Sequence, residues 1–393
     1  MYSEERNQRV IELCRALVGE KSYSGEESKV AQILETYMKE QRFDDIIIDD
    51  YGNIIGKIKG KKPGKKLLFD GHMDTVPVGN KEDWSQEPFQ AKISGGKLYG
   101  RGTTDMKGAI AAFVSAAAYF AEDTGRDFAG ELYVAGVVHE ECFEGVAARS
   151  ISQIVKPDYV VIGEASDLNL KIGQRGRAEI VIETFGVPAH SANPEKGINA
   201  VYKMSKLIEE IQKLTPEEQP ALGKGILELT DIKSSPYPGA SVVPEYCRAT
   251  FDRRLLVGET KESVLKPIQD LINRMAAEDS TLKAKVSYAR GEEECYTGNR
   301  IEGERFFPGW LYEEKEEFIQ KALQQLNKRG FFPEITHYNF CTNGSHYAGE
   351  AKIPTFGLGP SAESLAHTID EYVEVDQLLK ASECYYAVME ALL

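Results

Sequence analysis

The sequence has no excess of basic charge. Its 47 lysine and arginine residues are outnumbered by 62 aspartate and glutamate residues, which gives a formal net charge of -15. A surface this acidic repels phosphate backbones, so we expect no nucleic-acid partner. Cations bound by some of these carboxylates would make the real net charge less negative than the formal value.

The sequence also has no apolar run long enough to cross a membrane. The longest, AIAAFVSAAAYFA after Gly108, is rich in alanine and falls short of the roughly 20 residues that a span needs. Near the N-terminus, Val10, Ile11, Cys14 and Leu17 follow helical spacing and are separated by charged residues. This pattern is typical of an amphipathic surface helix and not of a signal peptide. We therefore expect no membrane attachment.

Paired cysteines and covalent nucleophile motifs are absent as well. The six cysteines are scattered and form no Cys-x-x-Cys pair. This spacing disfavours a disulfide framework or a cysteine zinc site, and it favours reduced thiols in a cytoplasmic protein. There is no Gly-x-Ser-x-Gly motif, and Cys142 has only His139 nearby, on a predicted strand where burial is its simplest role. Catalysis by a serine or cysteine nucleophile is therefore disfavoured.

The 393 residues favour two domains over one. In the first part of the chain, short apolar runs at 66–70, 131–139 and 158–163 predict buried strands, and the stretches 107–121 and 143–154 predict helices. Alternation of strands and helices indicates an α/β domain with a mainly parallel sheet covered by helices.

The middle of the chain predicts a different unit. Its expected elements are a strand at 177–186, a helix at 197–213, strands near 225–233 and 242–254, a helix at 260–277 and a strand at 282–289. The order β-α-β-β-α-β is that of a ferredoxin-like domain. Alternation then resumes with a helix at 313–329, strands at 334–338 and 353–357, and a helix at 374–392. We expect a catalytic domain in two parts, 1–175 and 293–393, interrupted by an inserted domain at 176–292.

Among only six histidines, His72 and His367 have the most informative surroundings. His72 follows a predicted strand in LLFDGHMDTVP, and Asp74 lies two residues further on. In extended chain these side chains share a face, so the carboxylate can orient an imidazole that binds metal. Taken alone, the pattern is equally typical of a hydrogen-bonded loop histidine.

Three acidic positions follow other predicted strands or begin a helix. Asp105, in LYGRGTTDMKGAIAAF, stands where a dinucleotide-binding loop would have its third glycine, and it is either a helix N-cap or a metal ligand. Glu140 and Glu141 adjoin a strand end, where two carboxylates repel each other unless a cation neutralises one or both stay solvated. Glu164 ends the buried run in DYVVIGEAS, where parallel sheets build their sites. Together with His72, these positions predict one site at one sheet edge.

The segments GHMDTVP, GRGTTDMKGAIAA, HEE, GEAS and AHTIDEY resemble the zinc aminoacylase/carboxypeptidase family. This family includes acetylornithine deacetylase, succinyl-diaminopimelate desuccinylase, glutamate carboxypeptidase and aminoacylase-1. The resemblance spans nearly the whole chain in the same order. It implies a two-zinc catalytic domain that carries an inserted lid and dimerisation domain, and hence a homodimer.

The resemblance also implies a role for each site residue. One zinc would be bound by His72 and Glu164, the other by Glu141 and His367, and Asp105 would bridge the two. Two divalent ions lower the pKa of a shared water and polarise the scissile carbonyl. As general base, Glu140 would move the proton of this water to the leaving amine, while Asp74 would orient His72. Cobalt or manganese can replace zinc with such ligands.

The predicted inserted domain contributes two further candidates by the same resemblance. His190, in FGVPAHSANPEKGINAV, would reach across the dimer to stabilise the oxyanion; on its own it reads as a loop histidine. Arg254, in ATFDRRL, would grip a substrate carboxylate, a task that suits a planar guanidinium. A salt bridge with the neighbouring Asp252 is the alternative for this arginine.

Two segments depart from the family pattern. Residues 241–244 read Ser-Val-Val-Pro where many desuccinylases have Asn-Val-Ile-Pro, and residues 342–346 read Thr-Asn-Gly-Ser-His where a Gly-Gly pair with an acid is usual. Both segments lie near the substrate in the family, so Asn343 and Gly344 are implied substrate contacts. Because of these departures, the acyl group of the known relatives is not carried over.

The sequence therefore predicts a dinuclear-zinc amidohydrolase or peptidase. Its substrate would be a small N-acyl amino acid or peptide with a free carboxylate, cleaved by a deacylase or exopeptidase reaction. One alternative is another dinuclear hydrolase, such as a phosphoesterase, which the acidic surface and the lone Arg254 disfavour. The other is a catalytically silent metal-binding protein, which the intact Glu140 disfavours.

Overall fold

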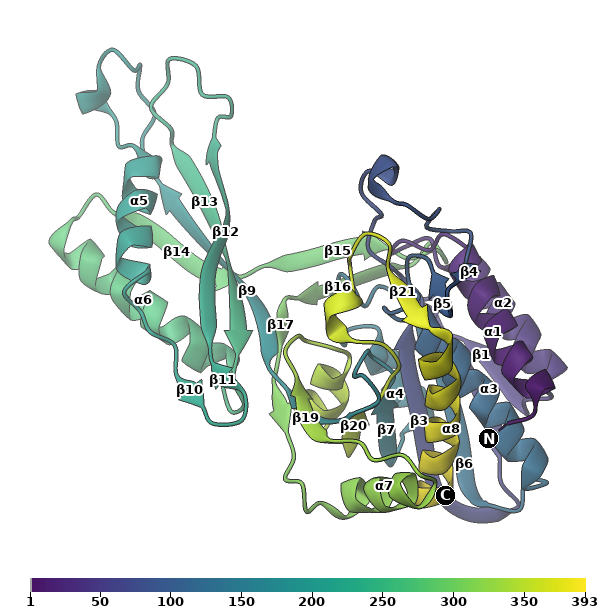
Figure 1. Cartoon of the computed structure of the whole chain (residues 1–393). Coiled ribbons are helices and arrows are strands. Elements are labelled where there is room, and N and C mark those ends of the chain that lie inside the picture. Colours follow the sequence, from purple (N-terminus) through teal and green to yellow (C-terminus); the bar gives the residue numbers. More distant parts are fainter. Residues whose placement is uncertain (1) are drawn as a thin grey trace. The chain divides into compact units, whose positions relative to one another are not determined.

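The computed structural model describes residues 2–393, which divide into two compact units (Figure 1). The first unit contains the residues up to 174 together with 292–303 and 310–393, and the second contains 175–291 and 304–309. The domain limits expected from the sequence remain predictions. The expected limits assign residues 304–309 to the catalytic domain. In the structure, residues 304–309 belong to the second unit.

A nine-stranded sheet forms the centre of the first unit, in the order β1-β2-β6-β3-β7-β20-β8-β18, with β19 also paired to β8. The strands are β1 (Asp45–Ile48), β2 (Ile54–Lys59), β3 (Lys62–His72), β6 (Ala129–Val137), β7 (Tyr159–Ile162), β8 (Leu170–Gln174), β18 (Trp310–Leu311), β19 (Ile335–Tyr338) and β20 (Thr355–Gly357). The central pairs β6–β3, β3–β7 and β7–β20 are parallel. The predicted α/β fold with a mainly parallel sheet is confirmed.

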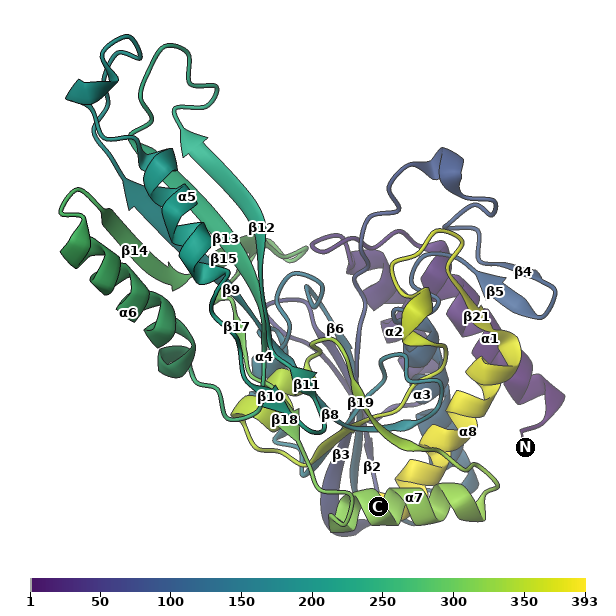
Figure 2. The same ribbon diagram turned by 60° about the vertical axis from the view of Figure 1, so that its left-hand side comes forward.

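Six α-helices belong to the first unit: α1 (Glu4–Gly19), α2 (Ser28–Glu40), α3 (Lys107–Asp123), α4 (Ala148–Val155), α7 (Glu317–Lys328) and α8 (Val375–Leu392). The alanine-rich α3 is buried along nearly its whole length and packs against α1, α8 and β3, because small side chains allow close approach on every face (Figure 2). Helix α4 begins five residues later than the predicted 143. Gly145 has a φ of 87°, which a right-handed helix cannot contain.

A small three-stranded sheet flanks the central one in the first unit. It consists of β4 (Lys92–Ser94), β5 (Lys97–Tyr99) and β21 (Tyr372–Glu374), in the order β21-β5-β4. Tyr372 pairs with Tyr99 in antiparallel register. This pairing brings the segment that follows His367 against the turn that leads to Asp105.

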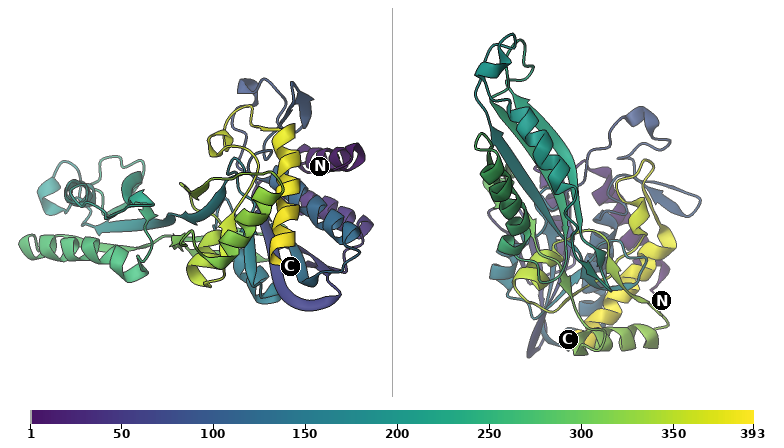
Figure 3. Two further views of the ribbon diagram at one scale, coloured as in Figure 1. Left: turned by 60° about the horizontal axis from the view of Figure 1, so that its bottom comes forward. Right: turned by 90° about the vertical axis from the view of Figure 1, so that its left-hand side faces the viewer.

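The second unit has the predicted β-α-β-β-α-β order: β9 (Gly176–Phe185), α5 (Ala200–Ile211), β12 (Ile226–Ser235), β13 (Tyr246–Leu255), α6 (Lys261–Glu278) and β14 (Lys283–Tyr288). Its strands are all antiparallel, in the order β12-β13-β9-β14, with the short β17 (Phe306–Phe307) also on β9. Residues along β13 alternate between buried and half-buried, and the buried face packs with α5 and α6 into one core (Figure 3). The ferredoxin-like order is confirmed.

Two further observations concern residues 2–393 as a whole. None of the helices described for them combines the length and the apolar character that crossing a bilayer would require. Among the same residues, no disulfide bond joins any of the six cysteines.

Candidate metal centre

The predicted site residues of the first unit lie where the parallel strands end. His72 is the last residue of β3, and in the strand register it lies opposite Val137, the last residue of β6. Glu140 and Glu141 follow this end of β6 after His139, whose φ of 55° turns the chain sharply. Glu164 follows the end of β7 by two residues. Parallel pairing therefore delivers all these side chains to one edge of the sheet.

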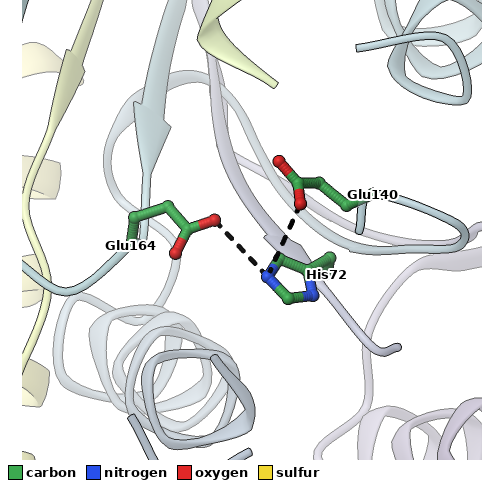
Figure 4. Close-up of side chains that lie close together, drawn as sticks. All are labelled: His72, Glu140 and Glu164. Atoms are coloured by element: carbon green, nitrogen blue, oxygen red, sulfur yellow. Dashed lines mark ion pairs between the residues drawn. The ribbon is translucent and has the colours of Figure 1, made fainter. Parts of the chain in front are cut away.

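A first group of side chains surrounds the Nε2 atom of His72. This nitrogen lies 3.4 Å from Oε1 of Glu164 and 3.9 Å from Oε2 of Glu140 (Figure 4). All three side chains are buried, and their nearest ligand atoms lie within 4.8 Å of one another. His72 and Glu164 are spaced as ligands around one ion would be, and Glu140 lies at the edge of this group.

A second group surrounds Asp105, which also contacts His72 of the first group. Oδ1 of Asp105 lies 2.8 Å from Nε2 of His72, and its Oδ2 lies 2.9 Å from Nε2 of His367. Glu141 completes this group, with Oε2 3.2 Å from the same nitrogen of His367. One carboxylate thus contacts both histidines with different oxygens, as a ligand that bridges two ions must.

Asp74 holds the chain around this centre in a way that the sequence did not indicate. Nδ1 of His72 is 2.8 Å from the backbone carbonyl of Asp74 and 3.5 Å from its carboxylate. The carboxylate also accepts hydrogen bonds from the backbone N–H groups of Glu140 and Glu141, at 3.1 and 3.2 Å, and from the hydroxyl of Ser24 at 2.7 Å. The carbonyl thereby orients the imidazole, and the carboxylate anchors the turn that carries the glutamate pair.

The buried carboxylates of the centre carry more negative charge than its two histidines can balance. Burial, reinforced by the nearby charge of Asp105, raises the pKa of Glu164 to about 7 and also raises the pKa of Glu141. Burial raises the pKa of Glu140 well above its ordinary value, and its Oε1 atom is buried without a hydrogen-bond partner. Two imidazoles cannot balance so many buried carboxylates. A pair of divalent cations fits both the charge and the mixed histidine and carboxylate ligands, which suit zinc, cobalt or manganese.

A buried network behind the centre includes residues that the sequence reasoning missed. Asp70, two residues before His72 on β3, accepts hydrogen bonds from the amide of Asn343 at 2.9 Å and from the hydroxyl of Tyr347 at 2.8 Å. The other end of the Asn343 amide accepts from the backbone N–H of Gly145 at 2.8 Å. A charged residue inside the apolar run LLFDGH was the available signal for Asp70.

The two loop residues implied as substrate contacts are buried. Both ends of the Asn343 side chain bind within the protein, as described above. Gly344 is also buried; its N–H donates to the hydroxyl of Thr342, and a Cβ at this position would lie 2.8 Å from the indole nitrogen of Trp310. Both residues pack within the loop, and their implied contact with substrate remains a prediction.

His190 and Arg254 lie in the second unit. His190 is exposed, and its Nδ1 accepts a hydrogen bond from the backbone N–H of Ala192 at 3.0 Å. Arg254 is half-buried on β13, with Nε 2.9 Å from Oδ1 of Asp252. The salt bridge considered as the alternative for Arg254 is therefore formed. The roles of both residues toward substrate remain predictions.

Residues 68–391, which make up most of the chain, match Peptidase family M20/M25/M40. The chain belongs to this family. The matched residues include all the motif segments on which the resemblance was based. The resemblance to this family is therefore confirmed.

Individual relatives place the chain within the M20 family. It is 33% identical over 381 residues to the uncharacterized protein YgeY of Escherichia coli (strain K12), covering 95% of this chain and 92% of that one. It is 30% identical over 396 residues to succinyl-diaminopimelate desuccinylase 2 of Ruegeria sp. (strain TM1040), covering 96% and 94%. These alignments run over nearly the full length of each protein, so both units are shared.

Solved structures show the same fold at lower identity. Aminopeptidase PepT of Bacillus cereus superposes with a TM-score of 0.76 at 20% identity, covering 98% of each chain. YXEP of Bacillus subtilis, described as a dinuclear metal binding peptidase of the M20 family, superposes with a TM-score of 0.73 at 14% identity, covering 99% of each chain. The chain is thus a member of a family of metal-dependent peptidases and amidohydrolases.

Proposed function

We propose that this protein is a dinuclear-zinc amidohydrolase that cleaves an amide bond in a small N-acyl amino acid or peptide with a free carboxylate. The observation that carries the proposal is the position of Asp105, whose two oxygens lie 2.8 and 2.9 Å from the two histidines of the centre. One ion would be held by His72 and Glu164, the other by Glu141 and His367, with Asp105 between them. Bound ions would polarise the scissile carbonyl and supply a nucleophilic water at neutral pH.

Glu140 is the proposed proton carrier. It lies at the edge of the first ligand group, 3.9 Å from Nε2 of His72, and it has one buried oxygen without a partner. Burial raises its pKa and so makes the Glu140 carboxylate a stronger base, which can take a proton from the attacking water and deliver it to the leaving amine. Asp74 keeps the Glu140 backbone in place through its carboxylate.

The second unit is proposed to bind the substrate and a second subunit. Arg254 would grip the free carboxylate, and His190 of the partner subunit would stabilise the oxyanion. Strand β12 is the outer strand of its sheet, and exposed apolar side chains cluster on this unit: Phe185, Val187, Tyr202, Ile226, Ile232, Tyr237 and Val242. A long sheet edge with exposed apolar residues is a surface that soluble proteins usually cover. Pairing with a second copy would cover it.

Desuccinylase and peptidase relatives define the substrate class to test. The Ruegeria relative is a succinyl-diaminopimelate desuccinylase, and the structures of similar fold include peptidases. The buried Asn343 and Gly344 belong to a loop that departs from the desuccinylase pattern. We therefore propose an amide substrate with a different acyl group, in a cytoplasmic setting consistent with the scattered cysteines.

The first test replaces the proton carrier without removing a ligand. Glu140→Gln should retain two equivalents of metal and lose turnover by about a hundredfold or more, because the proton can no longer be moved. The matched control is Glu131→Gln at the opposite end of β6, where the carboxylate pairs with Lys57 at 2.7 Å. Hydrolysis of N-acyl amino acids, dipeptides and a phosphate ester would be assayed with zinc, cobalt or manganese. Near-normal activity of Glu140→Gln, or activity on the ester alone, would refute the proposal.

A further inference from the structure

The carboxylate of Glu371 is fully buried inside the turn that carries Asp105. Its Oε1 accepts hydrogen bonds from three backbone N–H groups, those of Gly102 at 3.0 Å, Thr104 at 2.9 Å and Asp105 at 3.2 Å. Its Oε2 forms a buried ion pair with Nη1 of Arg101 at 2.5 Å. The turn from 101 to 105 is thus wrapped around one side chain from elsewhere in the chain.

The small flanking sheet explains why Glu371 lies there. Tyr372 is the first residue of β21 and pairs with Tyr99 on β5, and the backbone carbonyl of Glu371 accepts from the N–H of Gly100 at 2.9 Å. The turn that follows β5 therefore begins beside Glu371. N–H groups of one turn that converge on one oxygen form a concave site for an anion, and here the protein supplies the anion itself.

Glu371 is linked to two of the proposed metal ligands at once. It bonds to the backbone of Asp105, and it follows His367 by four residues in the same segment. The side chains of these two ligands meet at 2.9 Å. A shift of Glu371 would therefore change the separation of both ligands, although Glu371 is not itself among the groups that can touch a metal ion.

We propose that Glu371 is a positioning residue that sets Asp105 and His367 against each other and so determines how tightly the centre holds its two ions. This inference rests on the proposed function, because it needs Asp105 and His367 to be ligands. Residues that orient metal ligands from behind typically change metal affinity about 10- to 100-fold when they are replaced.

A purely structural role for the buried ion pair is the rival explanation, and the chain offers a matched control for it. Glu363 precedes His367 by four residues, as Glu371 follows it by four, and it pairs with the largely buried Lys171 at 2.7 Å. Its other oxygen accepts a hydrogen bond from the side-chain amide of Asn339 at 3.2 Å, so these partners of Glu363 lie outside the turn at 101–105. Glu363→Gln therefore removes a less buried ion pair from the same segment without touching Asp105.

The test measures metal retention of the full-length protein by competition with a chromophoric chelator for zinc. Thermal unfolding of the metal-free protein, measured in parallel, records any loss of structure. We expect Glu371→Gln to weaken retention about tenfold or more, because an amide keeps an acceptor for the N–H groups but turns a donor toward Arg101. Glu363→Gln should retain zinc like the wild type. Glu371→Asp keeps the charge but is too short to reach the turn, so it should also weaken zinc retention. This variant replaces Glu371→Gln in the test if Glu371→Gln does not fold.

Wild-type retention by a folded Glu371→Gln or Glu371→Asp would overturn the inference, and so would equal losses in the Glu371 and Glu363 variants. Failure of the wild type to bind two zinc equivalents would instead refute the proposed function. Unfolding of both Glu371 variants in the presence of saturating zinc would assign Glu371 a structural role and also count against the inference.

Discussion

Individual carboxylates in this protein differ mainly in what surrounds them. Glu350 receives a two-pronged contact from Arg149, at 2.7 and 3.0 Å, and a hydrogen bond from Nδ1 of His346 at 2.9 Å. Glu140 is buried beside other acids and has an oxygen without a partner. The pKa of the partnered Glu350 is therefore lowered and that of Glu140 is raised, so the first stabilises the fold as an anion and the second is suited to moving protons.

Glu350 should stabilise the first unit in a pH-dependent way. Partial burial raises its pKa, but the hydrogen bonds from His346 and Arg149 outweigh burial and lower the pKa to about 2, from an ordinary 4.5. Its stabilising effect is thus complete above pH 5 and is lost as the pH falls toward 2. We expect Glu350→Gln to lower the free energy of unfolding by about 1 kcal/mol at pH 7, a modest value because the side chain is partly exposed.

Urea unfolding followed by tryptophan fluorescence would measure this effect, because both tryptophans, Trp84 and Trp310, lie in the first unit. The difference from wild type should shrink steadily between pH 5 and pH 3. Glu35→Gln, which removes an exposed pair with Lys39 on α2, is the control and should change little at either pH. A deficit for Glu350→Gln that stays constant with pH would contradict the assignment.

At the scale of secondary-structure elements, the position of Glu164 depends on a close approach between two strand ends. Gly359 follows β20 and lies against the residues that follow β7. A Cβ at Gly359 would be 2.1 Å from the carbonyl oxygen of Gly163 and 2.3 Å from that of Glu164. Only a residue without a side chain allows these backbones to lie so close, and the parallel β7–β20 pair brings them together.

Gly359→Ala should therefore disturb both stability and the metal centre. The clash is with backbone atoms that cannot rotate away, so we expect a loss of about 2–3 kcal/mol in the free energy of unfolding and weaker zinc retention through displaced Glu164. Gly19→Ala at the end of α1 is the control, since the nearest atom to its Cβ would be 4.0 Å away. That change should alter stability by less than about 0.5 kcal/mol. Unchanged zinc retention by Gly359→Ala would show that Glu164 does not depend on this contact.

At the scale of the whole molecule, the proposal of a dimer with His190 acting in trans can be tested by mixing two inactive variants. His190→Ala lacks the oxyanion donor, and Glu140→Gln lacks the proton carrier. In a mixed dimer, one site receives intact Glu140 from one subunit and His190 from the other. An equal mixture should recover about one quarter of wild-type activity, because half of the dimers are mixed and each has one complete site.

Subunit exchange would be verified by sedimentation and by mixing at a concentration where dimers re-equilibrate. Each variant alone, and a mixture of Glu140→Gln with an Asp105→Asn variant, provides the baseline. The second mixture should stay inactive, because Glu140 and Asp105 must come from the same chain. Absence of recovery in exchanging, folded subunits would rule out catalysis by His190 across the dimer.

Much of the architecture follows from local sequence. The apolar runs before His72, Glu140 and Glu164 predict buried strands whose ends meet, because parallel strands have their carboxyl ends at one sheet edge. The order of elements in the second unit was also predictable, since the strand and helix periodicities there are distinct. Helix α4 was predicted too early, because one glycine with a positive φ outweighs the helical pattern before it.

By itself, then, the sequence determined the α/β and ferredoxin-like units, the family, and which residues are candidates for metal ligands. Only the tertiary structure decided how those residues are supported. Glu371 bonds to Asp105 from 266 positions away, Asp70 bonds to Asn343 from 273 positions away, and the Asp74 carboxylate also bonds to the turn that carries Glu140. A hydrogen bond between distant segments depends on the packing of the intervening chain, and no local periodicity records it.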